Sequence, residues 1–147
     1  MNQERVDMMW MRQALLEAEK ALEEGEIPVG AVLVCQERLI AKSHNLTETL
    51  CDVTAHAEMQ VFTSGAAFLG SKYLKDCTLY VTLQPCPMCA GAAYWTQLDR
   101  LVYGAEDQKH AHIDRASLYH PKTQIEGGVL REECAALLQN FFARKRK

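Results

Sequence analysis

Two short motifs contain residue types that bind metal ions and move protons. The first is His56-Ala57-Glu58, and the second is Pro85-Cys86-Pro87-Met88-Cys89. Cys86 and Cys89 are three positions apart, so in a helical turn both sulfur atoms project to one side, and a helix N-terminus favours their thiolate forms. One imidazole and two thiolates suit zinc, and a catalytic zinc site keeps its fourth position for water. The motifs therefore predict a zinc site with the ligands His56, Cys86 and Cys89.

The position of Glu58 favours a catalytic over a structural metal. A structural zinc ion normally has a fourth protein ligand, for which the spare histidines are candidates, although their spacing does not resemble a zinc-finger pair: His44, His110, His112 and His120. A carboxylate two positions from His56 can accept a proton from a zinc-bound water and redeliver it to a leaving amine. H-x-E followed by P-C-x-x-C is the signature of zinc nucleobase deaminases, and all five fixed positions are present. We therefore predict hydrolytic deamination with Glu58 as the proton shuttle.

Helical and extended patterns alternate along the chain and must position these residues. Apolar spacing and turn residues predict, in order, a helix over 8–24, strands over 27–34 and 39–41 joined as a hairpin by a turn at 36–38, a helix over 55–68, a strand over 78–83, a helix over 87–95, a strand over 101–103 and a last helix over 129–144. Residues 106–128 predict a loop with a short helical piece. Alternation of this kind implies an α/β fold with a largely parallel sheet that is covered on both faces.

The bulk composition predicts one domain over residues 1–147. The chain has 147 residues, of which 48% are hydrophobic, and no stretch approaches a membrane span of about 18 to 20 apolar residues. No signal peptide is evident, so the six cysteines are expected to be metal ligands or thiols in the reducing cytoplasm, with Cys35, Cys51, Cys77 and Cys134 as packing residues. The net charge of -3 argues mildly against a general nucleic-acid binder, although the chain ends with four cations, Arg144 to Lys147.

Over nearly its whole length the sequence resembles the bacterial tRNA-specific adenosine deaminases of the TadA type. The segments that carry the resemblance are 26–34, 54–58, 78–83 and 85–92, together with 128–142, where small-molecule relatives are not similar. The resemblance implies a three-layer α/β/α cytidine-deaminase-like fold with a central mixed sheet of about five strands. It also implies one zinc ion per subunit, a homodimer, and conversion of the wobble adenosine to inosine in the anticodon stem-loop of an arginine tRNA with the anticodon ACG.

The same resemblance implies three substrate-binding residues. Asn45 matches an asparagine that contacts the target nucleoside, and Val29 and Leu83 match residues that line the base pocket. The alternatives are a turn asparagine bonding its own backbone, and simple core packing. Three segments depart from the family pattern: Asn45-Leu46-Thr47 in place of Asn-Arg-Pro, Gln84 in place of glutamate, and His110 to Asp114 in place of a glycine-rich loop. We expect these changes to alter RNA contacts at the rim of the site. Lys42, Lys109 and Lys122 can compensate for them by neutralising phosphates.

Two other functions remain open from the sequence. The segment from Pro85 to Cys89 and the Tyr94-Trp95 pair also resemble guanine deaminases, which share the zinc site, so a small-molecule base deaminase is the first alternative. The second is a zinc-stabilised RNA-binding module without turnover. Such a module would have no use for Glu58, because a structural metal needs no proton shuttle.

Overall fold

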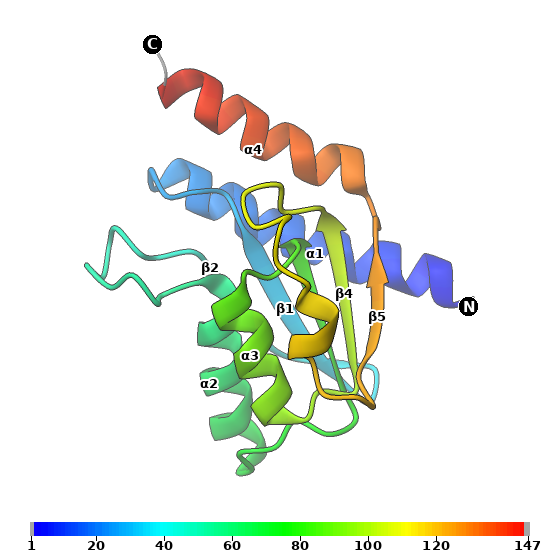
Figure 1. Ribbon diagram of the computed structural model, residues 1–147. Coiled ribbons are helices and arrows are strands. Elements are labelled where there is room, and N and C mark those ends of the chain that lie inside the picture. Colours follow the sequence, from blue (N-terminus) through cyan, green and yellow to red (C-terminus); the bar gives the residue numbers. More distant parts are fainter. Residues whose placement is uncertain (1, 146–147) are drawn as a thin grey trace.

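A five-stranded sheet in the order β2-β1-β3-β4-β5 forms the centre of the molecule (Figure 1). The computed structural model describes residues 2–145, so Arg146 and Lys147 of the basic C-terminal end lie outside the described residues. The elements are α1 (Gln3–Glu23), β1 (Gly30–Cys35), β2 (Arg38–His44), α2 (Ala57–Leu69), β3 (Cys77–Leu83), α3 (Pro87–Thr96), β4 (Arg100–Ala105), a 3-10 turn η1 (Arg115–Leu118), β5 (Gln124–Gly127) and α4 (Arg131–Lys145).

The sheet is mixed, as the resemblance implied. Strand β1 pairs antiparallel with both β2 and β3, whereas β4 lies parallel to β3 and to β5. The expectation of a largely parallel sheet was therefore wrong at β1, which is antiparallel to both of its neighbours. The two strands predicted to be joined by a turn are β1 and β2, and they form the expected hairpin. Its turn residues, Gln36 and Glu37, both have positive φ angles, 51° and 67°, the backbone of a two-residue turn whose twist matches that of the paired strands.

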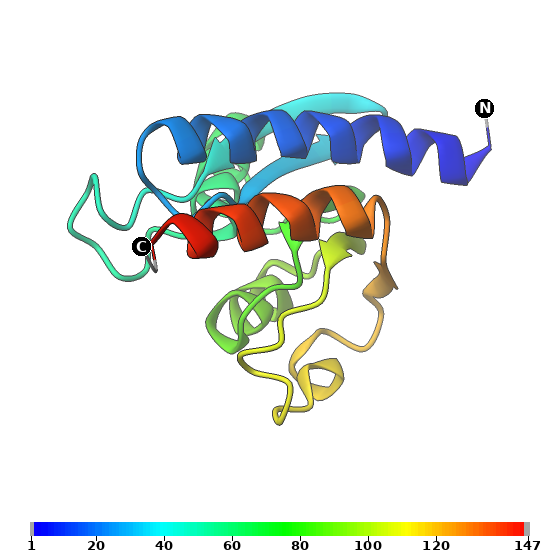
Figure 2. The ribbon, with the colours of Figure 1, turned by 90° about the horizontal axis from the view of Figure 1, so that it is seen from above.

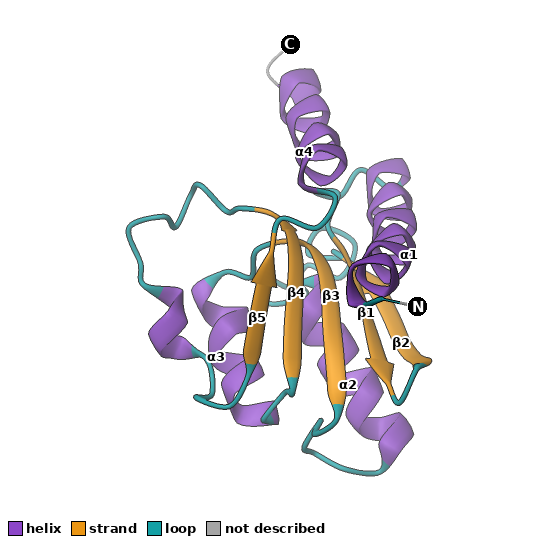
Figure 3. Cartoon of the chain, turned by 90° about the vertical axis from the view of Figure 1, so that its right-hand side faces the viewer, coloured by secondary structure: helices purple, strands orange, loops and turns teal. Residues whose placement is uncertain are grey.

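Helices cover both faces of the sheet, which confirms the three-layer fold. Helices α1 and α4 lie side by side on one face, and α2 and α3 lie on the other (Figures 2 and 3). Alternation along β1 supplies both cores: Ala31 and Leu33 belong to the cluster shared with α2 and α3, whereas Val32 and Val34 belong to the cluster shared with α1 and α4. Among the described residues, no helix combines the length and apolar character that a membrane crossing requires.

Two element boundaries differ from the sequence prediction. Helix α1 begins at Gln3 rather than Met8, because the Asn2 side chain accepts a hydrogen bond from the Arg5 backbone N–H at 2.9 Å and caps the helix. Strand β5 falls in the segment predicted as a loop, and its residues Gln124–Gly127 are all exposed at the sheet edge. A four-residue edge strand with one large apolar residue has no alternation from which it could be recognised. The predicted short helical piece is η1.

One edge of the sheet gathers the chemistry-bearing segments. Strands β3 and β4 end there, and the antiparallel direction of β1 and the hairpin bring the start of β1 and the end of β2 to the same edge. Helices α2 and α3 begin just beyond this edge, at Ala57 and Pro87. The strand ends and both helix N-termini therefore surround one volume.

Candidate metal and substrate site

The N-termini of α2 and α3 contribute the two sequence motifs. His56 is the N-cap residue of α2 and Cys86 is the N-cap residue of α3, both with extended backbone, and Pro87 occupies the first turn of α3. Proline fits that position because its missing N–H would have no intrahelical partner. Cys89 follows within the same turn, so the helix start presents both sulfur atoms. The positive ends of both helix dipoles point at this place and favour anionic ligands.

The ligand atoms of His56, Cys86 and Cys89 lie as a tetrahedral metal requires. The Nδ1 atom of His56 is 3.6 Å from the Sγ atom of Cys86 and 3.6 Å from the Sγ atom of Cys89. Zinc bonds of about 2.0 Å to nitrogen and about 2.3 Å to sulfur, at a tetrahedral angle, place those atoms about 3.5 Å apart. Over residues 2–145 the group that could hold a metal comprises these three residues, and it includes none of the four other histidines. The donor set and its spacing therefore fit zinc.

Hydrogen bonds within this group shift the pKa values of its three members in different directions. The hydrogen bond with Cys89, and a second one with His56, lower the pKa of Cys86 to about 4, although burial opposes them. The hydrogen bond with Cys86 and burial together raise the pKa of the Cys89 thiol. The hydrogen bond with Cys86 also raises the pKa of His56. The lowered pKa favours the thiolate form of Cys86, the protonation state in which a cysteine binds a metal.

Glu58 lies at the floor of the site, on the first turn of α2, with only 4% of its surface exposed. Burial raises the pKa of this carboxyl to about 7. A side chain with a pKa near the working pH can both accept and release a proton, which is the requirement for a general acid and base. Burial thus gives the Glu58 carboxyl a pKa at which it can exchange a proton near neutral pH.

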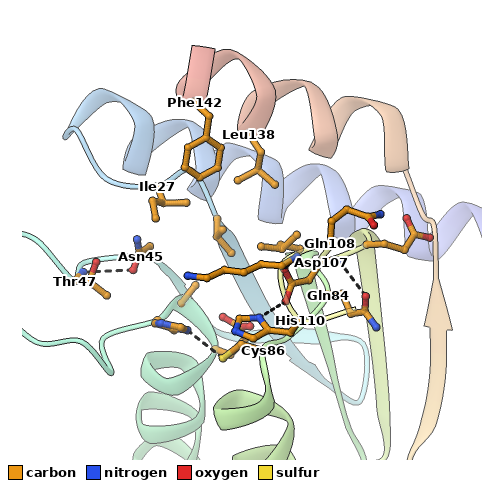
Figure 4. A pocket seen from close by; sticks show the side chains of 17 residues that line it. Ile27, Asn45, Thr47, Gln84, Cys86, Asp107, Gln108, His110, Leu138 and Phe142 are labelled. Carbon is orange, nitrogen blue, oxygen red and sulfur yellow. Dashed lines mark hydrogen bonds and ion pairs between the residues drawn. The ribbon is translucent and has the colours of Figure 1, made fainter. Parts of the chain in front are cut away.

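A cavity of about 530 Å³ opens over His56, Cys86 and Glu58 (Figure 4). Its size lies within the range of about 300 to 1,000 Å³ that is usual for small-ligand sites. All the predicted site residues line it except Cys89, which is buried beneath. These are Val29, Asn45, His56, Glu58, Leu83 and Cys86. Asn45 also accepts a hydrogen bond from the Thr47 backbone N–H at 3.4 Å, so the turn geometry considered for it is present alongside its place in the cavity.

The side of the cavity next to α4 consists of residues to which the sequence assigned no role. Leu138 and Phe142 project from α4, and Ile27 from the segment before β1, toward the same opening (Figure 4). Phe142 keeps 42% of its surface exposed at this mouth. The Phe141-Phe142 pair was visible in the sequence, but only the course of α4 over the sheet edge shows which ring faces the cavity.

The segments that depart from the family pattern do lie at the rim. Thr47, Gln84 and His110 all line the cavity, as does Lys109. Of the other two cations expected to compensate, Lys42 lines a separate hollow beside α1, and neither Lys42 nor Lys122 lines the cavity. Of the three lysines expected to compensate, all within the described residues, Lys109 is thus the one that lines the cavity.

The remaining cysteines are free thiols with different surroundings. Cys77 and Cys134 are buried, as expected of packing residues, and Cys35 is half-buried. Cys51 is exposed on the loop between β2 and α2, so the expectation that it packs in the core was wrong. This loop has no apolar periodicity from which burial could be judged.

Comparison with known proteins gives the class to which this fold and site belong. Residues 6–146 match the family described as MafB19-like deaminase. The chain is therefore a deaminase over almost its entire length.

Individual relatives narrow the class further. A tRNA-specific adenosine deaminase of Bacillus subtilis (strain 168) is 42% identical over 96% of this chain and 91% of its own length. A solved structure from a study of A-to-I editing by tRNA:A34 deaminases matches with a TM-score of 0.82 and 41% identity, over 88% of this chain and 99% of that one. A Bacillus subtilis guanine deaminase structure matches less completely, with a TM-score of 0.67 and 37% identity over 76% of this chain and 69% of that one. The chain belongs to the tRNA-specific adenosine deaminase family.

Proposed function

We propose that this protein hydrolytically deaminates the wobble adenosine of a tRNA anticodon loop to inosine, releasing ammonia. The observation that carries the proposal is the union of a metal-ready His56, Cys86 and Cys89 group with the buried Glu58 carboxyl at the floor of one cavity. Family membership supplies the substrate class, since the Bacillus subtilis relative is named a tRNA-specific adenosine deaminase and the solved structure at 41% identity comes from a study of tRNA:A34 deaminases.

His56, Cys86 and Cys89 are proposed to hold one zinc ion in each subunit. Bound zinc would lower the pKa of a coordinated water to about 7 and so supply a hydroxide nucleophile at neutral pH. Glu58 is proposed to accept the proton of that water, deliver a proton to the ring nitrogen, and then protonate the departing amino group. Its buried position keeps bulk water from competing for these protons.

The cavity is proposed to receive a base that has been turned out of its loop. Val29 and Leu83 provide apolar surfaces for the ring, and Asn45, which lines the same cavity, offers amide donors and an acceptor. A nucleotide in an anticodon loop can be splayed at lower cost than one inside a duplex. Free adenosine should be a poor substrate, because it lacks the flanking nucleotides that the rim can bind.

The wider biological setting is also part of the proposal. We expect a homodimer acting in the cytoplasm on an arginine tRNA with an ACG anticodon, with residues 1–147 forming one deaminase domain. The cations Arg144 and Lys145 at the end of α4 can neutralise phosphates beside the mouth.

Guanine deamination is the competing function, and the similarity to the Bacillus subtilis guanine deaminase supports it. The same metal group would serve both reactions. Sequence similarity favours the tRNA substrate, because the tRNA-specific adenosine deaminase of Bacillus subtilis is 42% identical over 96% of this chain, whereas the guanine deaminase is 37% identical over 76%.

Parallel assays of the zinc-loaded protein separate these functions. An ACG arginine tRNA transcript, the same transcript with guanosine at position 34, guanine and cytosine are incubated separately, and inosine and ammonia are measured. We expect inosine at position 34 of the first transcript and no ammonia from the other three. Ammonia from guanine with an unmodified tRNA would establish the competing function, and bound zinc with no product from any substrate would establish a non-catalytic module.

A further inference from the structure

A buried arginine organises the loop beside the cavity. Arg115, at the start of η1, is only 6% exposed, and its guanidinium donates from Nη1 to Asp107 Oδ2 at 2.8 Å and from Nη2 to the Asp107 backbone oxygen at 3.2 Å. His110 Nδ1 lies 2.7 Å from the same Asp107 Oδ2 atom. One carboxylate oxygen therefore joins Arg115 to His110 across the segment 106–115, which we call the Asp107 loop.

The same guanidinium ties this loop to the segment that precedes the metal-binding Cys86. Arg115 Nη1 also lies within hydrogen-bond distance, 3.3 Å, of the Pro85 backbone oxygen. Gln84 reinforces the connection. Its side-chain Oε1 atom accepts a hydrogen bond from the Asp107 backbone N–H at 3.0 Å, and its backbone N–H donates to the Ala105 backbone oxygen at 2.8 Å. The loop is thus attached at Gln84 and Pro85, directly before the N-cap of α3.

The consequence for the cavity follows from which loop residues line it. Residues 106–110 all border the opening, and His110 points into it beside Cys86 (Figure 4). Arg115 itself does not line the cavity. Arg115 therefore holds the loop residues that can contact a bound nucleotide, although it does not itself face the cavity.

We propose that Arg115 is a positioning residue for substrate binding, which holds Asp107, Lys109 and His110 at the rim in the arrangement that the bound RNA requires. Loop order established before binding need not be gained during binding, so the tether lowers the entropic cost of forming the complex. The reacting atoms would be handled by Glu58 and the metal ligands, which belong to α2 and α3 and not to the loop. The kinetic part of this inference rests on the proposed function.

The ion pair of Arg100 with Asp7 is a matched control within the same chain. It also joins an arginine to an aspartate, here a half-buried Arg100 and a buried Asp7, with Arg100 donating from both Nη atoms to the two carboxylate oxygens at 2.7 Å. It joins the first residue of β4 to α1, at the opposite end of the strand from the cavity. Loss of either pair should lower stability, but only the Arg115 pair should affect the site.

The test compares Arg115→Met, Arg115→Lys and Arg100→Met with the wild-type zinc-loaded protein. Kinetics with an ACG anticodon stem-loop should show that Arg115→Met raises KM about tenfold and leaves kcat within about threefold, the signature of lost binding rather than lost chemistry. Lysine restores a positive charge beside Asp107, but it lacks the two guanidinium nitrogens that together bond Asp107 and the Pro85 backbone oxygen. Arg115→Lys should therefore give an intermediate KM. Arg100→Met should leave both constants unchanged.

Amide hydrogen exchange followed by mass spectrometry provides a readout that does not depend on the substrate. Residues 106–110 should exchange faster in Arg115→Met than in the wild type, and at the wild-type rate in Arg100→Met. Unchanged exchange in this loop, or a KM for Arg115→Met equal to that of the wild type, would overturn the proposal. If the wild-type protein failed to deaminate the stem-loop, the proposed function would fail, whereas the exchange comparison would still decide whether Arg115 orders the loop.

Discussion

The Nδ1 atom of His56 lies 3.6 Å from the Sγ atom of Cys86, although 29 residues separate them in the chain. Each atom stands at the N-terminus of a different helix, and both helices start at the same edge of the sheet. The separation is close to that of a nitrogen and a sulfur ligand on one tetrahedral zinc ion, about 3.5 Å. The fold therefore brings the ligand atoms to the separation that binding requires.

Replacing Cys86 by serine should abolish tight zinc binding. A serine hydroxyl is not ionised at neutral pH, so the site would lose one anionic ligand, with an affinity loss on the order of 100-fold or more. Zinc content after gel filtration and competition with a chromogenic chelator measure the loss. Cys51→Ser, which removes an exposed thiol, serves as the control and should keep one zinc per chain. Full zinc content in Cys86→Ser would contradict the ligand assignment.

Asn45→Asp tests substrate binding by the cavity wall. Aspartate keeps the size of asparagine and can still accept from the Thr47 N–H, but it has no amide donors for the substrate. The loss of a hydrogen bond of about 1 to 3 kcal/mol should lower kcat/KM by roughly 5- to 150-fold. Thr47→Ser should have little effect, since the backbone N–H is retained. An unaltered kcat/KM in Asn45→Asp would leave Asn45 as a turn residue only.

The Asp7 carboxylate should make stability depend on pH. Burial alone would raise the pKa of Asp7, but hydrogen bonds from Arg100, Tyr80 and Gln3 outweigh it and hold the pKa below its usual value. A lowered folded-state pKa contributes stability that is present above the unfolded pKa of about 3.9 and is lost as the pH falls through the folded value. Asp7→Asn should therefore cost about 3 to 5 kcal/mol at pH 7, because Arg100 is left unpaired.

Urea unfolding at pH 7 and pH 3 measures this dependence. The difference in unfolding free energy between wild type and Asp7→Asn should shrink at pH 3. The exposed Asp76 provides the control, and Asp76→Asn should change little at either pH. An Asp7→Asn deficit of equal size at both pH values would show that the carboxylate charge is not the source of the stability.

Alanine substitutions at Gly30 and Gly91 should have different effects on stability. A Cβ atom at Gly30 would lie 2.1 Å from the Ala14 backbone oxygen of α1, whereas one at Gly91 would meet nothing within 4 Å in the chain. Gly30→Ala must push α1 away from the sheet and should cost about 1 to 3 kcal/mol or more. Gly91→Ala, inside α3, should be neutral or stabilising by up to about 1 kcal/mol. Thermal unfolding of both variants decides, and equal stability of Gly30→Ala and wild type would refute the close approach.

The metal group was accessible from the sequence because its spacing is local. Two residues separate Cys86 from Cys89, and one separates His56 from Glu58, so each motif implies its own geometry before any tertiary contact is known. The mixed sheet of about five strands and the cavity positions of Val29, Asn45 and Leu83 came from resemblance rather than from periodicity. Periodicity alone suggested a largely parallel sheet.

Long-range contacts explain what the sequence did not reveal. Phe142 faces the cavity because α4 crosses the sheet edge, and no local pattern encodes that crossing. In the sequence, nothing distinguishes Arg115 from the other charged residues of an irregular loop. In the structure it is buried against Asp107, eight residues earlier. Strand β5 is held by pairing with β4 and not by its own propensity.

The most direct test of the central claim is the amount of inosine formed at position 34 by wild type and by Glu58→Gln, with zinc content measured in both. Glutamine has the shape of glutamate but cannot carry the proton, and loss of general acid and base catalysis typically costs about 10²- to 10⁴-fold in rate. We predict one zinc per chain in both proteins, inosine at A34 with the wild type, and a rate lower by at least about 100-fold with the variant. Equal rates in the two proteins, or no inosine with the zinc-loaded wild type, would contradict the account.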